Sequence, residues 1–154
     1  FSFKGFDLSF FFQGVQGNNI YNVSRVRFDK TNTDADATSI RILDRWTPTH
    51  ENTDIPSFVG SVVGEQNQST RWMENGSYLR LKNLTIGYTL SGLKKNVLHI
   101  SSARIYVAGT NLFTETAYSG FEPEARTGVD SRGGIDLATY PSQKSYSIGL
   151  NVKF

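Results

Sequence analysis

The last ten residues of the chain, 145–154, read Ser-Tyr-Ser-Ile-Gly-Leu-Asn-Val-Lys-Phe. Apolar side chains occupy every second position of this stretch, and Ser, Gly, Asn and Lys occupy the positions between them. Successive side chains of a β-strand point to opposite faces, so the alternation predicts a strand with one apolar and one polar face. An edge strand of a soluble β-sandwich alternates in the same way, and this stretch alone therefore leaves two architectures open.

Three earlier segments, residues 6–14, 78–90 and 103–113, also have the character of strands. In the second segment the apolar positions before and after Lys82 are out of phase, which predicts a β-bulge there. The segments have about the 9–11 residues that a tilted transmembrane β-strand needs. In the third segment two outward-facing sets stay open, namely Ile105 with Val107 and Tyr106 with Ala108.

The connections between these segments differ greatly in length. Two are short, at residues 4–5 and 91–102, and two are long, at residues 15–76 and 114–143. In chain order both short connections fall at one end of the strands and both long ones at the other. Outer-membrane barrels alternate short periplasmic turns with long extracellular loops, whereas soluble domains rarely carry structureless connections of this length.

These patterns predict an all-β fold, in which the chain forms four antiparallel strands of a large transmembrane β-barrel with two long extracellular loops. Residues 1–3 would be the stub of a preceding strand. Four strands cannot close a barrel, because the smallest barrels have about eight and an open edge is not tolerated in lipid. We therefore expect the chain to be either the end of a larger barrel or one part of a split barrel.

Composition excludes several classes of function. The 16 Lys and Arg residues nearly balance the 14 Asp and Glu residues, which gives a net charge of +2 and no basic footprint for nucleic acid. Cysteine is absent, and this excludes disulfides, thiolate metal sites and cysteine nucleophiles. No apolar run is long enough for a transmembrane helix, and no signal peptide is visible at the first residues.

Motifs for metal binding or catalysis are incomplete. Asn32, Asp34 and Asp36 have the spacing of an EF-hand, but Ala37 and Leu43 stand where its Gly and Glu belong, so only a looser calcium site stays open. The histidines are isolated from each other, which argues against zinc. The densest carboxylates share one Gly-rich loop without an apolar wall: Glu122, Glu124, Asp130 and Asp136. We predict no catalytic residue, no metal ligand and no cofactor.

A short helix is expected at about residues 34–46. Its apolar residues Ile40, Leu43 and Trp46 recur every three positions, which predicts a packing stripe on one face of the helix. The loop around Asn32 to Asp36 is then read as a solvated acidic segment that precedes this helix.

Several stretches resemble the end of SusC/RagA-type TonB-dependent outer-membrane transporters of Bacteroidota. Residues 75–90, Asn-Gly-Ser-Tyr-Leu-Arg-Leu-Lys-Asn-Leu-Thr-Ile-Gly-Tyr-Thr-Leu, resemble a signature segment of that family. So do residues 106–113, Tyr-Val-Ala-Gly-Thr-Asn-Leu-Phe, and residues 118–124, Tyr-Ser-Gly-Phe-Glu-Pro-Glu. The same holds for residues 3–9, 45–48, 52–56, 134–136 and 139–141. The resemblance covers the whole chain in the order of the family and says nothing of the substrate.

The resemblance implies a barrel of about 22 strands with a plugged lumen, in the outer membrane. Residues 1–154 would be the C-terminal part of this barrel and supply its last four antiparallel strands, with the plug and the other strands outside this chain. It further implies import of oligosaccharides or peptides, a SusD-like surface lipoprotein as a lid, and energy from a TonB complex that acts through the parts missing here. The barrel assembly machinery and outer-membrane lipid are the other expected partners. A secreted β-sandwich that binds carbohydrate is the alternative function, and a passive porin or adhesin barrel is a third.

Candidate site residues follow from these patterns. The lipid-facing set is Phe10, Phe12, Leu84, Ile86, Tyr88, Ile148, Leu150 and Val152. Aromatic residues in exposed loops are the candidates for contact with the substrate or the lid: Trp72, Tyr118, Phe121 and Tyr140, together with Trp46. Phe154 resembles the terminal aromatic signal by which barrel precursors are captured for assembly. The polar residues of the opposite strand face would line the lumen: Asp7, Ser9, Gln13, Thr85, Gly87, Ser147 and Asn151.

Overall fold

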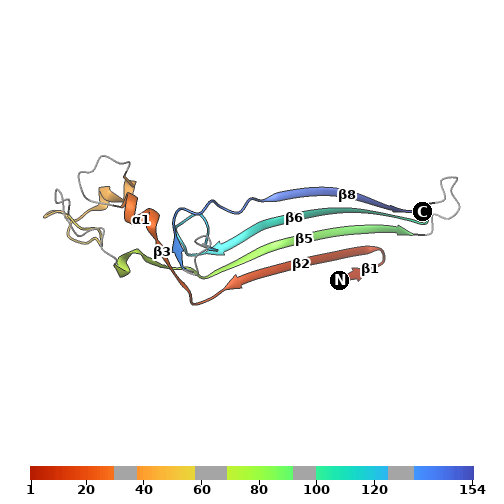
Figure 1. Cartoon of the computed structure of the whole chain (residues 1–154), viewed down its shortest axis with the longest axis horizontal. Helices are drawn as coiled ribbons and strands as arrows, with labels where there is room; N and C mark the ends of the chain where they lie inside the picture. Colours follow the sequence, from red (N-terminus) through yellow and green to blue (C-terminus); the bar gives the residue numbers. More distant parts are fainter. Residues whose placement is uncertain (30–37, 58–68, 92–99, 125–133) are drawn as a thin grey trace. The chain divides into compact units, whose positions relative to one another are not determined.

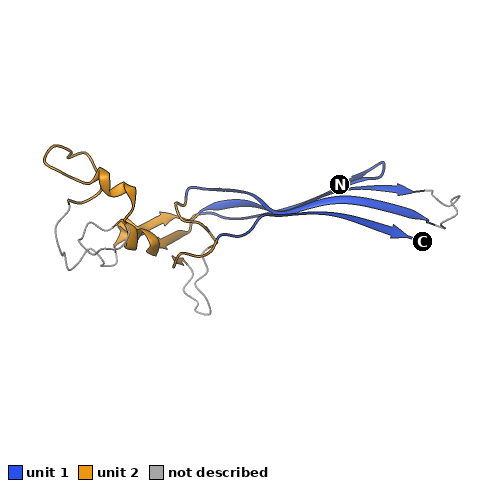
Figure 2. Cartoon of the chain, turned by 90° about the horizontal axis from the view of Figure 1, so that it is seen from above, with its two compact units in different colours: residues 1–16, 77–117, 141–154 blue, residues 17–76, 118–140 orange. Residues whose placement is uncertain are grey.

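The computed structural model describes residues 1–29, 38–57, 69–91, 100–124 and 134–154. The chain divides into two compact units, shown in different colours in Figure 2. Residues 1–16, 77–117 and 141–154 form one of them, here called the strand unit. Residues 17–76 and 118–140 form the other, here called the loop unit. Each is described by itself.

The strand unit is a five-stranded antiparallel sheet in the order β1-β2-β5-β6-β8 (Figure 1). Its strands are β1 (Ser2–Phe3), β2 (Phe6–Val15), β5 (Tyr78–Ser91), β6 (Ser102–Thr116) and β8 (Ser145–Lys153). Neighbours in the sheet are consecutive long strands of the sequence, as in an up-and-down barrel wall. The predicted fold class, four long antiparallel strands and a short stub, is confirmed.

The predicted bulge at Lys82 is present in the sheet. Phe10 pairs with Leu84, whereas Phe12 pairs with Leu81, so β5 carries one residue more than β2 between these two pairs. The pairing of β5 with β6 also shifts between Leu81 and Asn83. The extra residue reverses the phase of β5, and the apolar residues before and after Lys82 therefore lie on the same face.

The two ends of the sheet carry connections of different length. At one end the two-residue turn at Lys4 and Gly5, both with positive φ, joins β1 to β2, and residues 92–101 join β5 to β6. At the other end, where Val15 pairs with Tyr78, residues 16–77 and 117–144 leave the sheet. Both long connections thus depart from the same end, as the chain order predicts.

The loop unit contains a second, three-stranded sheet that we did not expect from the sequence. Its strands are β3 (Asn19–Asn22), β4 (Met73–Asn75) and β7 (Ile135–Asp136), in the order β4-β3-β7. β3 is antiparallel to β4 and parallel to β7. Because β7 comes from the second long connection and the other strands from the first, the sheet joins the two connections to each other.

Two of the predicted exposed aromatic residues lie in the interior of this unit. Trp72 is 4% exposed and Tyr118 is 5% exposed, and Ile20 and Ile55 are also buried. The predicted exposure of Trp72 and Tyr118 is therefore wrong. The physical reason is that a loop unit with few aliphatic residues uses its largest apolar side chains as its own core.

The helices of the loop unit also differ from the prediction. A 3-10 helix, η1, spans Ile40–Asp44 and begins after Ser39, whose hydroxyl caps it, while residues 30–37 lie outside the described residues. Ile40 and Leu43 are 80% and 75% exposed, so the predicted packing stripe is wrong in its described part. A second 3-10 helix, η2, spans Thr70–Trp72.

An α-helix, α1 (Val23–Phe28), was not predicted. It begins where the Asn22 side-chain oxygen accepts a hydrogen bond from the Arg25 backbone N–H, at 3.1 Å. Among the described residues, none of the helices is both long and apolar enough to cross a membrane.

Candidate membrane face, inner face and loop pocket

One face of the sheet is almost wholly apolar. Side chains of directly paired residues share a face, and the register joins Leu8, Ile86, Val107 and Ile148 in one row. The neighbouring rows are Phe6, Tyr88, Ile105 and Leu150, then Phe10, Leu84, Gly109 and Tyr146, then Leu90, Ala103 and Val152. All eight predicted lipid-facing residues thus lie on one face, with Phe12 opposite Leu81. The open choice on β6 is settled in favour of Ile105 and Val107.

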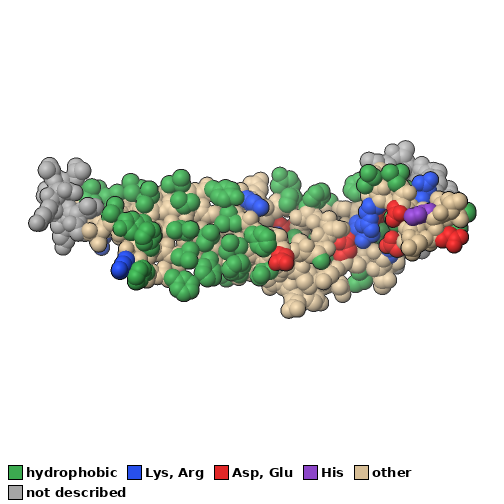
Figure 3. Space-filling view, turned by 180° about the vertical axis from the view of Figure 1, so that it is seen from behind, with side chains coloured by type: hydrophobic (Ala, Val, Ile, Leu, Met, Phe, Trp, Pro, Cys, Tyr) green, Lys and Arg blue, Asp and Glu red, His purple; other side chains and the backbone are tan. Residues whose placement is uncertain are grey.

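These apolar side chains are exposed within the chain. Ile148 is 78% exposed and Leu150 is 65% exposed, although both are aliphatic. Hydrophobic side chains gather over the long strands in Figure 3, whereas charged side chains gather over the loop unit. A continuous apolar face of this kind needs an apolar environment, either lipid or another protein.

The opposite face of the sheet is polar and centres on a guanidinium group. Arg104 Nε donates a hydrogen bond to Asp7 Oδ1 at 2.8 Å, across the intervening strand, and its guanidinium carbon lies 4.9 Å from the centre of the Tyr106 ring. A Cβ at Gly149 would overlap Tyr106 Cζ, so the absence of a side chain at Gly149 leaves room for the ring. The predicted lumenal residues Asp7, Ser9, Thr85, Gly87, Ser147 and Asn151 fall in this face, and Gln13 pairs with Arg80 on it. The part played by Arg104 was missed from the sequence.

Glu74 connects three segments of the loop unit. Its carboxylate accepts hydrogen bonds from the backbone N–H and the hydroxyl of Ser119, both at 2.8 Å, and from Asn22 Nδ2 and an Arg25 guanidinium nitrogen, both at 3.1 Å. Burial alone would raise the pKa of Glu74, but these hydrogen bonds outweigh it and hold the pKa below its ordinary value. The carboxylate therefore stays ionised and binds β4 to α1 and to the second long connection.

A second carboxylate, Asp136, joins residues of the second long connection to one another. It is 1% exposed and accepts hydrogen bonds from the Tyr118 hydroxyl at 2.6 Å and from the Thr139 backbone N–H at 2.7 Å. Burial, and then the hydrogen bond to Asp136, raises the pKa of Tyr118 well above its ordinary range. Tyr118 thus remains a neutral donor at every physiological pH.

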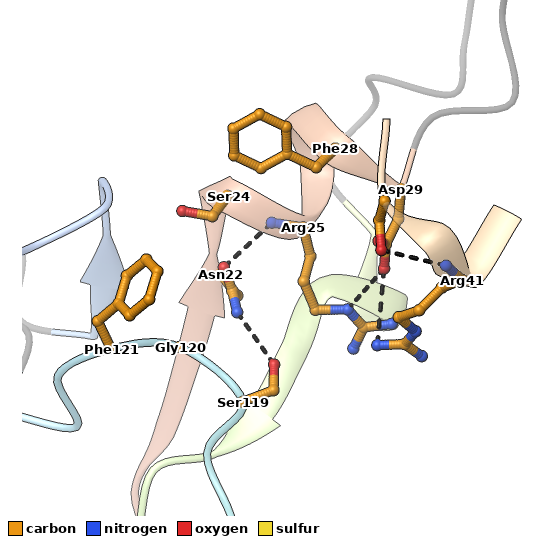
Figure 4. Close-up of a pocket in the computed structure, with 10 residues that line it drawn as sticks. Asn22, Ser24, Arg25, Phe28, Asp29, Arg41, Ser119, Gly120 and Phe121 are labelled. Atoms are coloured by element: carbon orange, nitrogen blue, oxygen red, sulfur yellow. Dashed lines mark hydrogen bonds and ion pairs between the residues drawn. The ribbon is translucent and has the colours of Figure 1, made fainter. Parts of the chain in front are cut away.

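A pocket of about 390 Å³ opens beside α1 in the loop unit (Figure 4). Asp29 lines the pocket, is 5% exposed and accepts a hydrogen bond from Arg25 Nε at 3.0 Å. A guanidinium nitrogen of Arg41 lies 3.6 Å from the same carboxylate. Phe28 and Phe121 contribute apolar walls. The sequence signal for this site is the i, i+4 spacing of Arg25 and Asp29 behind the Asn22 cap, and the site was not predicted from it.

The other two candidate loop contacts, Phe121 and Tyr140, are exposed. Phe121 lines the pocket and is 73% exposed, and Tyr140 is 77% exposed. The His50 Nε2 atom lies 2.7 Å from Asp44 Oδ1 at the surface. His99, Asp130 and the Asn32 to Asp36 segment lie outside the described residues. Within the described ranges no three side chains of the metal-ligating types gather into a metal site.

Comparison with known proteins gives the same assignment from sequence and from structure. No family model matches the chain. The TonB-dependent receptor P3 of Formosa agariphila is 35% identical over 160 residues, which cover 99% of this chain and 15% of that protein. The TonB-dependent receptor SusC of Bacteroides thetaiotaomicron is 25% identical over 154 residues, which cover 99% of this chain and 14% of that protein.

The solved structure of the RagAB peptide importer in its closed-closed state superposes with a TM-score of 0.82 at 32% identity, over 99% of this chain and 16% of the solved one. The chain belongs to the SusC/RagA-type TonB-dependent transporters. It spans about a sixth of the length of the relatives that it matches. Members of this family are β-barrel proteins of the outer membrane in Bacteroidota, and the SusC/RagA assignment rejects the alternative of a soluble β-sandwich.

Proposed function

We propose that this chain forms part of the barrel wall of an outer-membrane transporter that imports nutrients. The observation that carries the proposal is the two-faced sheet, apolar on the face of Ile148 and polar on the face of Arg104. One face then contacts lipid and the other lines the plugged lumen, as the size class of the relatives implies. The relatives named receptors and importers support transport rather than catalysis.

We further propose that import is energised through TonB and that the cargo is an oligosaccharide or a peptide. The relative SusC is a TonB-dependent receptor, and the RagAB neighbour is named a peptide importer. The plug and the contact with TonB would lie in the parts of the transporter outside this chain.

A SusD-like lipoprotein is the proposed lid over the loop unit. Phe121 and Tyr140 are its candidate contacts, because both rings are exposed and offer large apolar area at low entropic cost. Replacing both by Ala in the complete transporter should lower co-purification of the lipoprotein while barrel assembly is retained. The matched control is Leu137→Ala, which removes another exposed apolar side chain of the same unit. Equal recovery of the lipoprotein in all three proteins would reject the contact.

The transport proposal is tested in cells that carry or lack the complete transporter. Growth is measured on peptide and oligosaccharide mixtures as the nutrient source, with and without an uncoupler of the proton-motive force. We expect loss of growth on one class of mixture in the deletion strain, and loss of uptake when the uncoupler is added. Uptake that is insensitive to the uncoupler would point to the third reading, a passive porin.

A further inference from the structure

The pocket beside α1 belongs to neither face of the sheet and shares one residue, Phe121, with the proposed lid contact. Its described lining combines two aromatic rings, Phe28 and Phe121, with serine hydroxyls and the guanidinium groups of Arg25 and Arg41 (Figure 4). A volume of about 390 Å³ lies in the range of small-ligand sites. A pocket of this volume accommodates one or two amino-acid residues or sugar rings. It is too small to be a stable protein interface by itself, because such an interface buries more than about 1,000 Å².

The charges of the pocket are unequally satisfied. Asp29 and Arg25 neutralise each other at 3.0 Å, and Arg25 also donates to Glu74. Arg41 differs, because its nitrogen is 3.6 Å from Asp29, beyond hydrogen-bond length, and its side chain is 42% exposed. Among the described residues its guanidinium donates no hydrogen bond to another side chain. In the described part of the chain the Arg41 guanidinium is therefore held only by this longer ion pair and has hydrogen-bond donors available to a ligand.

The aromatic rings of the pocket indicate which chemical group would lie next to an anion bound at Arg41. Phe28 is 41% exposed and Phe121 is 73% exposed, so both rings offer apolar surface to a ligand. Ring faces stack well on flat or apolar groups. A planar carboxylate matches the forked donors of a guanidinium.

We propose that this pocket binds the part of the cargo where a carboxylate stands next to an apolar or ring-shaped group. Arg41 pairs with the carboxylate, and Phe28 and Phe121 pack against the neighbouring group. The C-terminal residue of a peptide and a uronic acid of an oligosaccharide both have this chemistry. The site rests on the proposed function, because it assumes that the loop unit faces the external medium.

The test uses the complete transporter in detergent and ligand-observed NMR. The probes are Ala-Ala-Phe with a free carboxylate and its C-terminal amide, and digalacturonate and its methyl ester. We expect one free acid to bind at least about tenfold more tightly than its uncharged counterpart, since charge-assisted hydrogen bonds contribute about 1.5–3 kcal/mol. The probe pair that shows the difference identifies the source of the carboxylate.

Matched variants locate the effect. Arg41→Gln should remove most of the preference for the free acid, and Arg41→Lys should retain part of it. Arg45→Gln makes the same charge change four positions away, outside the pocket lining, and should bind like the wild type. Phe121→Ala should weaken the acid and its uncharged counterpart alike, whereas Leu137→Ala should weaken neither.

Three results would overturn the proposal: no binding of either free acid, equal binding of acids and uncharged counterparts, or equal effects of Arg41→Gln and Arg45→Gln. Arg41→Gln that lowers co-purification of the lipoprotein but leaves probe binding intact would assign the pocket to the lid instead. Uptake in cells is measured in parallel. A protein that binds the acid through Arg41 but imports nothing keeps the site and rejects the transport proposal, whereas normal import with no effect of Arg41→Gln rejects the site alone.

Discussion

Gly149 on β8 pairs with Tyr106, whose ring lies on the polar face of the sheet. A Cβ at this position would be 2.2 Å from Tyr106 Cζ, so Gly149→Ala must displace the ring from its place beside Arg104. We expect a cost of about 1–3 kcal/mol, as for overpacking elsewhere. The measurement is the temperature at which the complete transporter loses its heat-modifiable mobility. Ser147→Ala, two positions away on the same face, is the control, and an equal melting temperature for both variants would contradict the packing described here.

The hydroxyl of Tyr118 is a second residue-scale test. Tyr118→Phe keeps the buried ring but removes one of the donors to Asp136. Loss of a partner to a buried carboxylate should weaken the loop unit by about 1–3 kcal/mol. Hydrogen exchange in β3 and β7 should accelerate. Tyr140→Phe removes a hydroxyl from a ring that is 77% exposed and should leave the exchange unchanged. The assignment fails if the two variants exchange alike.

Glu74 makes the stability of the loop unit depend on pH. Because its pKa is lowered on folding, its contribution is complete above the ordinary value of 4.5 and is lost as the pH falls through the lower, folded-state pKa. Protection from hydrogen exchange in β3 and β4 of the complete transporter should fall on acidification and report this loosening. Glu74→Gln should be weakened already at neutral pH and should lack this component of the acid transition. Identical acid transitions of the two proteins would show that Glu74 contributes nothing.

At the scale of elements, the long strands were predictable and the loop structure was not. The period-two pattern of β8 and the phase change at Lys82 are local signals, since each follows from side-chain alternation along one strand. The facing of β6 could not be read locally, because both of its faces carry apolar residues; only pairing with β5 and β8 decides it. The strands β3, β4 and β7 have two to four residues and pair across large sequence separations, so no short-range sequence pattern predicts them.

Phe154, just beyond β8, allows a prediction about assembly. It is 82% exposed, so Phe154→Ala should cost far less than the roughly 1.5–3 kcal/mol of a fully buried side chain. If the aromatic ring is a recognition signal for the assembly machinery, the amount of folded transporter in the outer membrane should nevertheless fall severalfold. Phe154→Tyr retains an aromatic ring and should assemble normally. Wild-type levels of the Ala variant, by quantitative blotting of folded protein, would remove the signal role from Phe154.

At the scale of the whole molecule, the family and the fold class followed from the sequence, whereas the candidate site did not. Connection lengths and strand alternation predict a barrel wall because lipid and a closed sheet impose them. Trp72 and Tyr118 were expected at the surface, because composition alone cannot show that the two long connections build a common core. Arg25 and Asp29 are only four residues apart, but Glu74 and Phe121 come near them only through that core, and so the pocket beside α1 was not predicted.

Spin labels along β8 test whether one face of this sheet contacts lipid. This chain has no cysteine, so single cysteines can be placed at residues 145–153 of the complete transporter after any cysteine elsewhere is replaced. In bilayers, collision rates with oxygen, which enters lipid, should be high at positions 146, 148, 150 and 152. Collision rates with a water-soluble nickel chelate should not be high at these four positions. Collision rates without a period of two, or oxygen maxima at 147, 149 and 151, would contradict lipid contact on the apolar face.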